Sequence, residues 1–287
     1  MGDVRYHDKE QLDRKLRAMK ADGPDTLHVV SDFDRTLTKC FYDGKKIPSS
    51  FAWIREGGYL TPDYPKKAFA LFNHYHPIET DDTLTQEYKY RKMEEWWREH
   101  EKLMIASGMH RDVVEEIIQR YQKVFREGAE RFFSLLENEG TPLLIFSAGI
   151  GNIIRGFLEK GGYLTPNVHI LSNTFAYDEQ GYATGYQRKS IHVLNKSETA
   201  LDDEYRQMVA GRKNVILLGD SLGDLGMVDE AETVNLIRIG FLNEDVEGKI
   251  DRYLDAYDVV ITGDGPMDEA NRILEQITHW TTPAHTF

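Results

Sequence analysis

The chain has 287 residues, of which 40% are hydrophobic, so it is long enough for one large α/β domain with an insertion or for two smaller domains. Lys and Arg total 35 against 48 Asp and Glu, which gives a net charge of -13, and the basic residues are scattered along the chain. This balance argues against a nucleic acid polymer as a partner. Cys40 is the only cysteine, and the N-terminal segment has no apolar run of signal-peptide or membrane-span length. We therefore expect a cytoplasmic protein without disulfides and without membrane contact.

Short apolar runs alternate with segments of helical period along most of the chain. This alternation predicts an α/β fold in which helices cover both faces of a parallel sheet. The segment "DEQGYATG", Asp178–Gly185, is typical of a hairpin turn. The expected strands lie at residues 27–30, 142–146, 168–171, 215–218, 234–239 and 259–261.

A stretch without a convincing strand interrupts this pattern from about residue 45 to residue 130. Its sequence predicts one long amphipathic helix that ends at Gly108 and a second helix that ends at Gly128. This module is either additional packing surface or a lid over the strand ends, where ligands bind in open α/β sheets. The predicted division is a core of residues 1–44 and 131–287 and a helical cap of residues 45–130, inserted after the first strand.

Polar side chains stand at four places where expected strands end or loops follow them. Asp32 and Asp34 follow the first strand in "VVSDFDRTLT", and their spacing points both carboxylates to one spot, where they repel each other unless a cation is present. Ser147 stands in "LLIFSAGIGN", where small residues open a helix whose free amides can cradle an anion. The other two stretches contribute Lys196, in "HVLNKSE", and Asp220 and Asp224, in "VILLGDSLGD".

Together these groups predict a site for phosphoryl transfer. Aspartates from two strands would hold Mg²⁺, while Thr, Ser, Lys and amide donors would hold a tetrahedral oxyanion beside it. Asp32 would attack phosphorus because the metal screens the repulsion between two anions, and Asp34 would protonate the leaving oxygen and later activate water. Each stretch alone has an ordinary explanation, such as a solvated turn, a helix N-cap or a surface lysine. Their joint order and spacing favour catalysis.

In chain order, "DFDRT", "SAG", Lys196 and "GDSLGD" resemble the four motifs of the haloacid dehalogenase (HAD) superfamily. The resemblance implies that Asp32 is the nucleophile and Asp34 the general acid/base. P-type ATPases have Thr at the second position and dehalogenases lack the acid, so Asp34 resembles the residue of a phosphatase. The candidate phosphate ligands are Thr36, Ser147, Ala148, Gly149 and Lys196, and the candidate metal ligands are Asp32, Asp34 through its backbone carbonyl, Asp220 and Asp224.

The resemblance extends over nearly the whole chain to the cytosolic 5'-nucleotidase III family, also called pyrimidine 5'-nucleotidases. The blocks that carry it include "LTQEYKYRKMEEWW", "IFSAGIGN" and "LLGDSLGDLGM". It implies an HAD-like Rossmannoid parallel sheet whose helical cap closes over the substrate. The implied activity is Mg²⁺-dependent hydrolysis of nucleoside 5'-monophosphates. The Trp-Trp pair resembles the branch that acts on 7-methylguanosine monophosphate, so we expect this nucleotide, then CMP and UMP, as substrates.

Base recognition is expected from the cap. By resemblance, Phe51, Glu79 and Trp97 align with base contacts of the family. Phe51 and Trp97 would form two walls of an aromatic slot, whereas Trp96 is assigned to the core because adjacent helix residues do not share a face. A cationic N7-methylated guanine would gain cation–π attraction from the indole and a charge-assisted pair with Glu79. His100 stands at a candidate base-binding position where the family can have Ser.

Two other functions stay open. A phosphotransferase would pass the phosphoryl group from Asp32 to another nucleoside, since the first half-reaction is the same. A nucleotide-binding protein without catalysis is disfavoured, because the set of Asp32, Asp34, Lys196 and Asp220 is intact. In each case the expected partner is a small nucleoside monophosphate, and we expect a monomer, although no sequence motif reports the oligomeric state.

Overall fold

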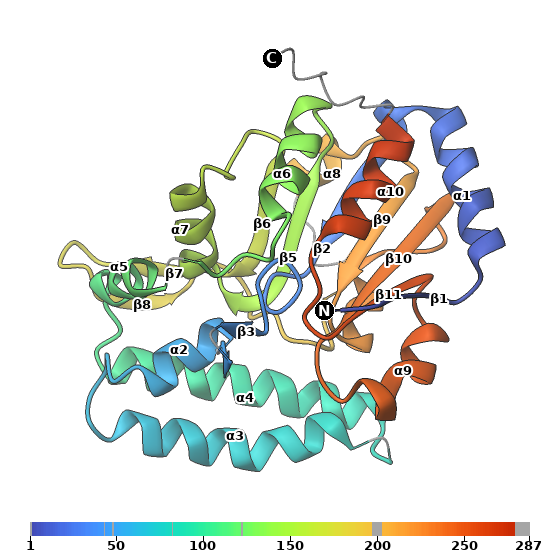
Figure 1. Cartoon of the computed structure of the whole chain (residues 1–287). Helices are drawn as coiled ribbons and strands as arrows, with labels where there is room; N and C mark the ends of the chain where they lie inside the picture. The colour runs from blue at the N-terminus through green and yellow to red at the C-terminus, as the bar shows by residue number, and fades with distance from the viewer. Residues whose placement is uncertain are drawn as a thin grey trace.

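A seven-stranded sheet forms the centre of the fold (Figure 1). Its strands are β1 (Val4–Tyr6), β2 (Leu27–Ser31), β5 (Leu143–Ile150), β6 (Val168–Asn173), β9 (Asn214–Gly219), β10 (Asn235–Leu242) and β11 (Val259–Thr262). The strand order is β1-β11-β10-β9-β2-β5-β6, and every pair is parallel except β1 with β11. The α/β class and the six expected strands are confirmed. The antiparallel edge strand β1 was not expected, so the insertion follows the second strand of the chain.

The computed structural model describes residues 2–42, 44–47, 49–81, 83–121, 123–196 and 203–278. The end of the expected core segment, residues 279–287, therefore lies outside the described residues. Within the described part, no helix combines the length and the apolar character needed to cross a bilayer.

Helices cover both faces of the sheet because consecutive strand residues point to opposite sides. Val29 and Ile216 pack with one set of helices, whereas Val30 and Leu217 pack with the other. The first set is α1 (Lys9–Asp22), α6 (Ala129–Asn138), α7 (Gly151–Gly161) and α10 (Asp268–Thr278). The second face carries α8 (Asp203–Met208), the short 3₁₀ helix η3 (Leu222–Met227) and α9 (Val246–Leu254), and a further 3₁₀ turn, η1 (Pro24–Thr26), precedes β2.

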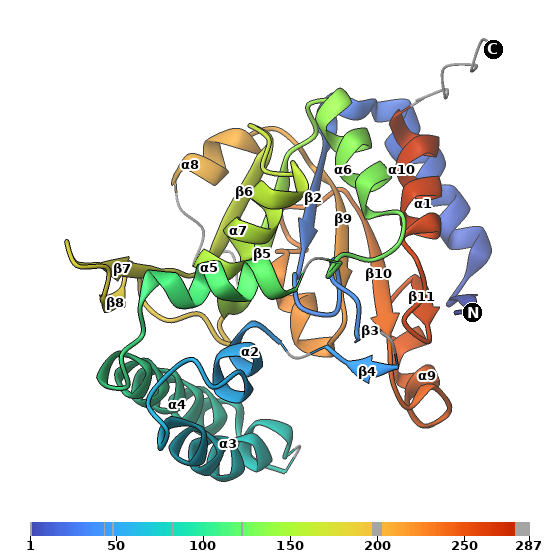
Figure 2. The same cartoon turned by 60° about the vertical axis from the view of Figure 1, so that its left-hand side comes forward.

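The inserted segment lies at the carboxyl ends of the parallel strands, as Figures 1 and 2 show for its first three helices. Its helices are α2 (Ser50–Glu56), α3 (Tyr64–Thr80), α4 (Gln86–Ala106) and α5 (Arg111–Arg120). The Thr85 hydroxyl accepts the Tyr88 N–H and caps α4, which ends before Gly108, where φ is +86°. The long predicted helix is therefore confirmed. A small hairpin, β3 (Phe41–Tyr42) with β4 (Lys45–Lys46), places one short strand in a stretch expected to have none.

The second predicted helix of the insertion is shorter in the structure than expected. We expected it to reach Gly128, but α5 ends at Arg120. The following chain pairs with the loop after β2, since the Lys39 N–H donates to the Val124 carbonyl and the Arg126 N–H donates to the Leu37 carbonyl. These contacts come from residues far away in the sequence, so the local helical period does not report them.

A hairpin from the core holds one end of the cap. Strands β7 (Phe175–Tyr177) and β8 (Ala183–Tyr186) are antiparallel and joined by the expected turn. The Tyr186 N–H donates to Glu101 Oε1 on α4 at 2.6 Å. The Ala183 N–H donates to the Met109 carbonyl, and the Arg111 N–H donates to the Gly181 carbonyl. The hairpin thus fixes the connection between α4 and α5 to the core.

Candidate active site

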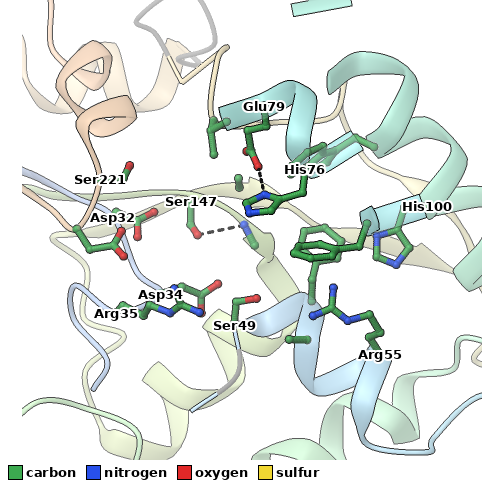
Figure 3. Close-up of a pocket in the computed structure, with 18 of the residues that line it drawn as sticks. Asp32, Asp34, Arg35, Ser49, Arg55, His76, Glu79, His100, Ser147 and Ser221 are labelled. Carbon is green, nitrogen blue, oxygen red and sulfur yellow. Dashed lines mark hydrogen bonds and ion pairs between the residues drawn. The ribbon is translucent and has the colours of Figure 1, made fainter. Parts of the chain in front are cut away.

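The strand ends and the cap enclose a cavity of about 600 Å³ (Figure 3). Figure 3 shows Asp32, Asp34 and Ser147 on one side of this cavity, and Arg55 and His100 on the other. We call these two parts the acid end and the base end. This arrangement brings together side chains from β2, β5, β9 and the cap helices, as expected for ligand binding at the carboxyl ends of parallel strands.

Three carboxylates cluster at the acid end. One oxygen from each of Asp32, Asp220 and Asp224 lies within 4.8 Å of the others. The ammonium of Lys196 joins two of them, at 2.5 Å from Asp32 Oδ1 and 2.9 Å from Asp224 Oδ1. All four side chains line the cavity, so the structure brings the first, third and fourth sequence motifs together.

Backbone contacts fix the loops that carry these acids. The Asp32 N–H donates to the Leu218 carbonyl at 3.0 Å, which joins the ends of β2 and β9. Both the N–H and the hydroxyl of Ser221 donate to Asp224 Oδ2 at 3.0 Å. Position 219 must be glycine for this approach, because a Cβ there would lie 2.6 Å from the Asp224 Cβ.

The acid end holds the carboxylates of Asp32, Asp34, Asp220 and Asp224, whose negative charge exceeds the positive charge of Lys196 and Arg35. Burial, with the charge of Asp224, raises the pKa of Asp220 to about 7. Burial also raises the pKa of Asp32 well above its usual range, although Lys196 opposes this shift. The burial of Lys196 alone would lower its pKa, but Asp224 and Asp32 raise it above the ordinary value. A crowded set of carboxylate oxygens with a surplus of negative charge is suited to a divalent cation.

Asp34 has different partners from Asp32. Its carboxylate accepts hydrogen bonds from the Ser50 N–H at 3.1 and 3.2 Å and from the Ser50 hydroxyl at 2.9 Å. Burial raises the pKa of Asp34, while the bonds from Ser50 act in the opposite direction. A raised pKa favours the protonated form, which a general acid requires. Asp34 therefore has the environment of an acid, held by the first residue of α2.

Apart from Lys196, which joins the acidic cluster, the expected phosphate ligands lie at the end of β5, with one exception. Ser147, Ala148 and Gly149 all line the cavity, and the Gly149 N–H donates to the Ser147 hydroxyl at 3.1 Å. They belong to the strand and do not open the helix, because α7 begins at Gly151 after an irregularity in the pairing with β6. The exception is Thr36, which is fully buried and does not line the cavity.

At the base end, the Phe51 ring contacts two other aromatic rings, those of Trp97 and His100. Phe51 and Trp97 have centroids 6.0 Å apart and ring planes at 82°, so they form a corner instead of two facing walls. His100 stacks on Phe51 at 5.3 Å, and its Nε2 lies 3.0 Å from the Tyr64 hydroxyl. Burial lowers the pKa of His100 to about 4, so its ring is neutral near pH 7. His76 Nδ1 lies 2.9 Å from Glu79 Oε2, which keeps that carboxylate beside the cavity.

The adjacent tryptophans have different surroundings. Trp96 is 8% exposed and stacks on Tyr75 at 5.7 Å, as expected for a core residue, although it also reaches the cavity. Trp97 packs against Phe51 and lines the cavity, and among the described residues nothing accepts a hydrogen bond from its buried Nε1–H. A ligand atom at this place would find an unused donor.

Several residues at the cavity were not expected from the sequence. Arg35, Arg55, His76 and Ser221 line it, and Ser50 contacts Asp34 directly. Arg35 follows the two aspartates and has φ of +63°, a strained value for a residue with a side chain. Arg35 and Ser221 stand inside the first and fourth motifs, which was a signal in the sequence, whereas Ser50, Arg55 and His76 become neighbours through the packing of the cap.

Comparisons with known proteins agree with this geometry. The family model for pyrimidine 5'-nucleotidase (UMPH-1) matches residues 35–278. A relative from Homo sapiens named 7-methylguanosine phosphate-specific 5'-nucleotidase is 38% identical over 262 residues, which cover 91% of this chain and 87% of the relative. A crystal structure of cytosolic 5'-nucleotidase IIIB bound to cytidine superposes with a TM-score of 0.86 and 32% identity, and covers 96% of this chain and 93% of that one.

A more distant likeness concerns the fold alone. A phosphoserine phosphohydrolase-like protein from Francisella tularensis superposes with a TM-score of 0.50 and 18% identity, and covers 79% of this chain and 92% of that one. The HAD-like fold class is thereby confirmed. Because the family model spans most of the chain and the human relative matches over nearly its full length, this chain belongs to the pyrimidine 5'-nucleotidase (UMPH-1) family and is a 5'-nucleotidase.

Proposed function

We propose that this protein hydrolyses nucleoside 5'-monophosphates by way of a phosphoryl group carried on Asp32. The observation that supports this most is the contrast between two carboxylates that lie two residues apart. Asp32 lies in the acidic cluster beside Lys196, whereas Asp34 is held apart by Ser50. At Asp32 the ammonium of Lys196 opposes the effect of burial on the pKa and supports the ionised form that a nucleophile needs. At Asp34 burial outweighs the hydrogen bonds from Ser50, so the pKa is raised and supports the protonated form that an acid needs.

The proposed reaction has two steps. In the first, an Asp32 oxygen attacks phosphorus, the bond from phosphorus to the nucleoside O5' breaks, and Asp34 donates its proton to that oxygen. In the second, Asp34 takes a proton from water, the water oxygen attacks phosphorus, and the bond to Asp32 breaks to release phosphate. Ser147, the amides after it and Lys196 would bind the phosphate oxygens. Thr36 has no part in this proposal because it does not reach the cavity.

The proposed cofactor is Mg²⁺. The crowded carboxylates of Asp32, Asp220 and Asp224, whose charge exceeds that of the neighbouring lysine, fit a hard divalent cation with oxygen ligands. The Asp34 backbone carbonyl is a further candidate ligand. When bound, the ion would offset the negative charge that builds up between the phosphate and the acids.

We further propose 7-methylguanosine monophosphate and CMP as substrates, with UMP weaker. Support comes from the name of the human relative and from the cytidine bound to the related structure. Within this chain, Trp97 and Glu79 line the base end, where an indole face attracts a cationic base and a carboxylate accepts hydrogen bonds from it. A cytoplasmic location is part of the same proposal, since the related structure is of a cytosolic enzyme.

A panel of nucleoside monophosphates tests this proposal. Phosphate release is measured for the 7-methylguanosine, cytidine, uridine, guanosine and adenosine nucleotides, with Mg²⁺ and with a chelator. We expect hydrolysis that requires the metal and is fastest, by kcat/KM, for 7-methylguanosine monophosphate. No release from any nucleotide would refute the proposal and favour a binding protein. An added acceptor nucleoside that becomes a second nucleotide would identify a phosphotransferase.

A further inference from the structure

Arg55 is a cation at the base end of the cavity. It lies on α2 four residues after Phe51, so the two side chains share the helix face that lines the cavity. The Arg55 side chain is only 14% exposed. Figure 3 shows its guanidinium directed into the cavity, close to His100 and away from Asp32. Arg55 therefore belongs to the part of the cavity that would hold the base.

Two aromatic rings hold the guanidinium in place. Its central carbon lies 4.7 Å from the ring centroid of Phe69 and 4.8 Å from that of Phe72. Arginine packs well on aromatic faces because its planar, weakly hydrated cation keeps its N–H donors free at the edge. The packing therefore orients Arg55 without using its hydrogen-bonding capacity.

Most donors of Arg55 have no acceptor among the residues that the structure describes. The guanidinium has five N–H donors. Its Nη2 pairs with Glu56 Oε1 at 3.1 Å, but Glu56 is 46% exposed and such pairs contribute little. Its Nε is buried and finds no acceptor in the described part of the chain. The part of the guanidinium that faces the cavity therefore keeps donors that a ligand there can use.

We propose that Arg55 is a specificity-determining residue, which donates a hydrogen bond to a carbonyl oxygen of the nucleotide base. This inference rests on the proposed function and deepens it. Glu79 accepts and Arg55 donates at the same end of the cavity, so a base edge with both an amino group and a carbonyl satisfies both residues. Cytosine and guanine carry both groups, whereas adenine has no carbonyl.

The charge of Arg55 has a second effect. A cationic base such as 7-methylguanine is repelled by a guanidinium in a partly buried site, where charges are weakly screened. Arg55 therefore opposes the preference for cationic bases that Trp97 and Glu79 produce. Its removal weakens the binding of neutral bases that have a carbonyl more than it weakens the binding of 7-methylguanine.

The test is nucleoside binding, measured by calorimetry, for wild type and three variants. Arg55→Met keeps the aliphatic packing on the phenyl rings but removes the donors and the charge, whereas Arg55→Lys keeps the charge and loses the planar fork. Arg98→Met is the matched control, since Arg98 is an exposed arginine of α4 that does not line the cavity. Melting temperatures check folding, and Arg55→Gln replaces Arg55→Met if that variant does not fold.

For Arg55→Met, we expect the affinity for cytidine and guanosine to fall by about 10- to 100-fold, the loss typical of a hydrogen bond to a charged group. Adenosine binding changes less than about threefold. The ratio of 7-methylguanosine affinity to cytidine affinity rises by roughly tenfold. The same ratio stays close to wild type in Arg55→Lys, and all affinities stay close to wild type in Arg98→Met.

Equal losses for all four nucleosides, or none, in a folded Arg55→Met protein would overturn the inference. So would a parallel loss in the hydrolysis of ribose 5-phosphate, which has no base and would report a role at the phosphate. Nucleoside binding does not depend on hydrolysis. A wild-type protein that hydrolyses no nucleotide would therefore refute the proposed function, while the nucleoside series would still decide the role of Arg55.

Discussion

Asp32 and Asp34 lie two residues apart, yet their carboxylates have separate partners, Lys196 and Ser50. We expect Asp32→Asn to lower kcat by roughly 10³-fold or more, because it removes the attacking oxygen. The protein still folds, since the amide occupies the same volume and reduces the crowding of buried carboxylates. Phosphate release and a melting curve measure the two effects. Rapid quench with labelled nucleotide is the control, and label recovered on Ser147 would exclude Asp32 as the nucleophile.

The proposed role of Trp97 is to distinguish bases by charge. Its indole forms a corner with Phe51, so a bound base would stack on one of these rings and meet the edge of the other. A cation gains up to about 2 kcal/mol from an indole face in a desolvated site. We expect Trp97→Ala to lower kcat/KM for 7-methylguanosine monophosphate by roughly tenfold more than for CMP. Trp53→Phe, a buried substitution away from the cavity, is the control for general loosening of the cap. Equal losses for both nucleotides would show that the ring does not respond to charge.

At the scale of elements, the end of β5 meets the start of α2. A Cβ at position 149 would lie 2.2 Å from the Ser50 hydroxyl and 3.1 Å from Asp34 Oδ2. We expect Gly149→Ala to push Ser50 away from Asp34 and to lower kcat by about 10²-fold, the lower limit for loss of a positioned acid. The measurement is kcat over a range of pH. If Ser50 no longer holds Asp34, the pH dependence on the side that reports the general acid changes.

Gly223→Ala is the control for this experiment. A Cβ there meets the Val193 carbonyl at 3.4 Å, an ordinary contact, and it lies on the short helix η3 beside the same cavity. We expect near wild-type activity from it. If the Gly149→Ala enzyme were as active as this control, the end of β5 and the start of α2 could move apart without an effect on Asp34, and the prediction would be wrong.

At the scale of the whole molecule, metal binding and stability are coupled through Asp220. Burial raises its pKa to about 7. Between the unfolded value near 4 and about 7, the metal-free native state holds more protons than the unfolded state, so this contribution to stability is present at low pH and lost as pH rises toward 7. Magnesium needs the ionised carboxylates. We expect Mg²⁺ to raise the melting temperature by a few degrees at pH 8 and by less at pH 5.5.

Asp220→Asn separates this effect from general salt stabilisation. The variant lacks one ligand and one titrating group, so Mg²⁺ should shift its melting temperature little at either pH. Calorimetric melting at a fixed ionic strength provides the measurement. A wild-type shift that is larger at pH 5.5 than at pH 8 would contradict the coupling.

The sequence predicted six of the seven strands of the sheet because each of the six is a short apolar run, whereas β1 has only three residues with an arginine in the middle. It also predicted the acid end, since Asp32 and Asp220 directly follow parallel strands and Ser147 lies near the end of another, at the same edge of the sheet. Lys196 reaches them from the loop after the β7–β8 hairpin. It failed where distant segments meet. The helix that begins at Arg111 was predicted to be too long. The chain after it pairs with the loop after β2, and the local periodicity of the sequence does not report this pairing. The contacts of Ser50 and the cavity position of Arg55 depend on how the cap lies on the core, which no local pattern encodes.

The hairpin β7–β8 has a consequence for engineering. Its strands belong to the core in sequence, but Tyr186, Ala183 and Gly181 bond to Glu101, Met109 and Arg111 around the end of α4. A chimera that exchanges only the inserted helices with those of a relative would therefore replace Glu101, the acceptor for the Tyr186 N–H, and would have to re-form the two main-chain hydrogen bonds at Met109 and Arg111. We therefore expect a grafted cap to keep its position over the strand ends only if residues 175–186 are transferred together with the insertion.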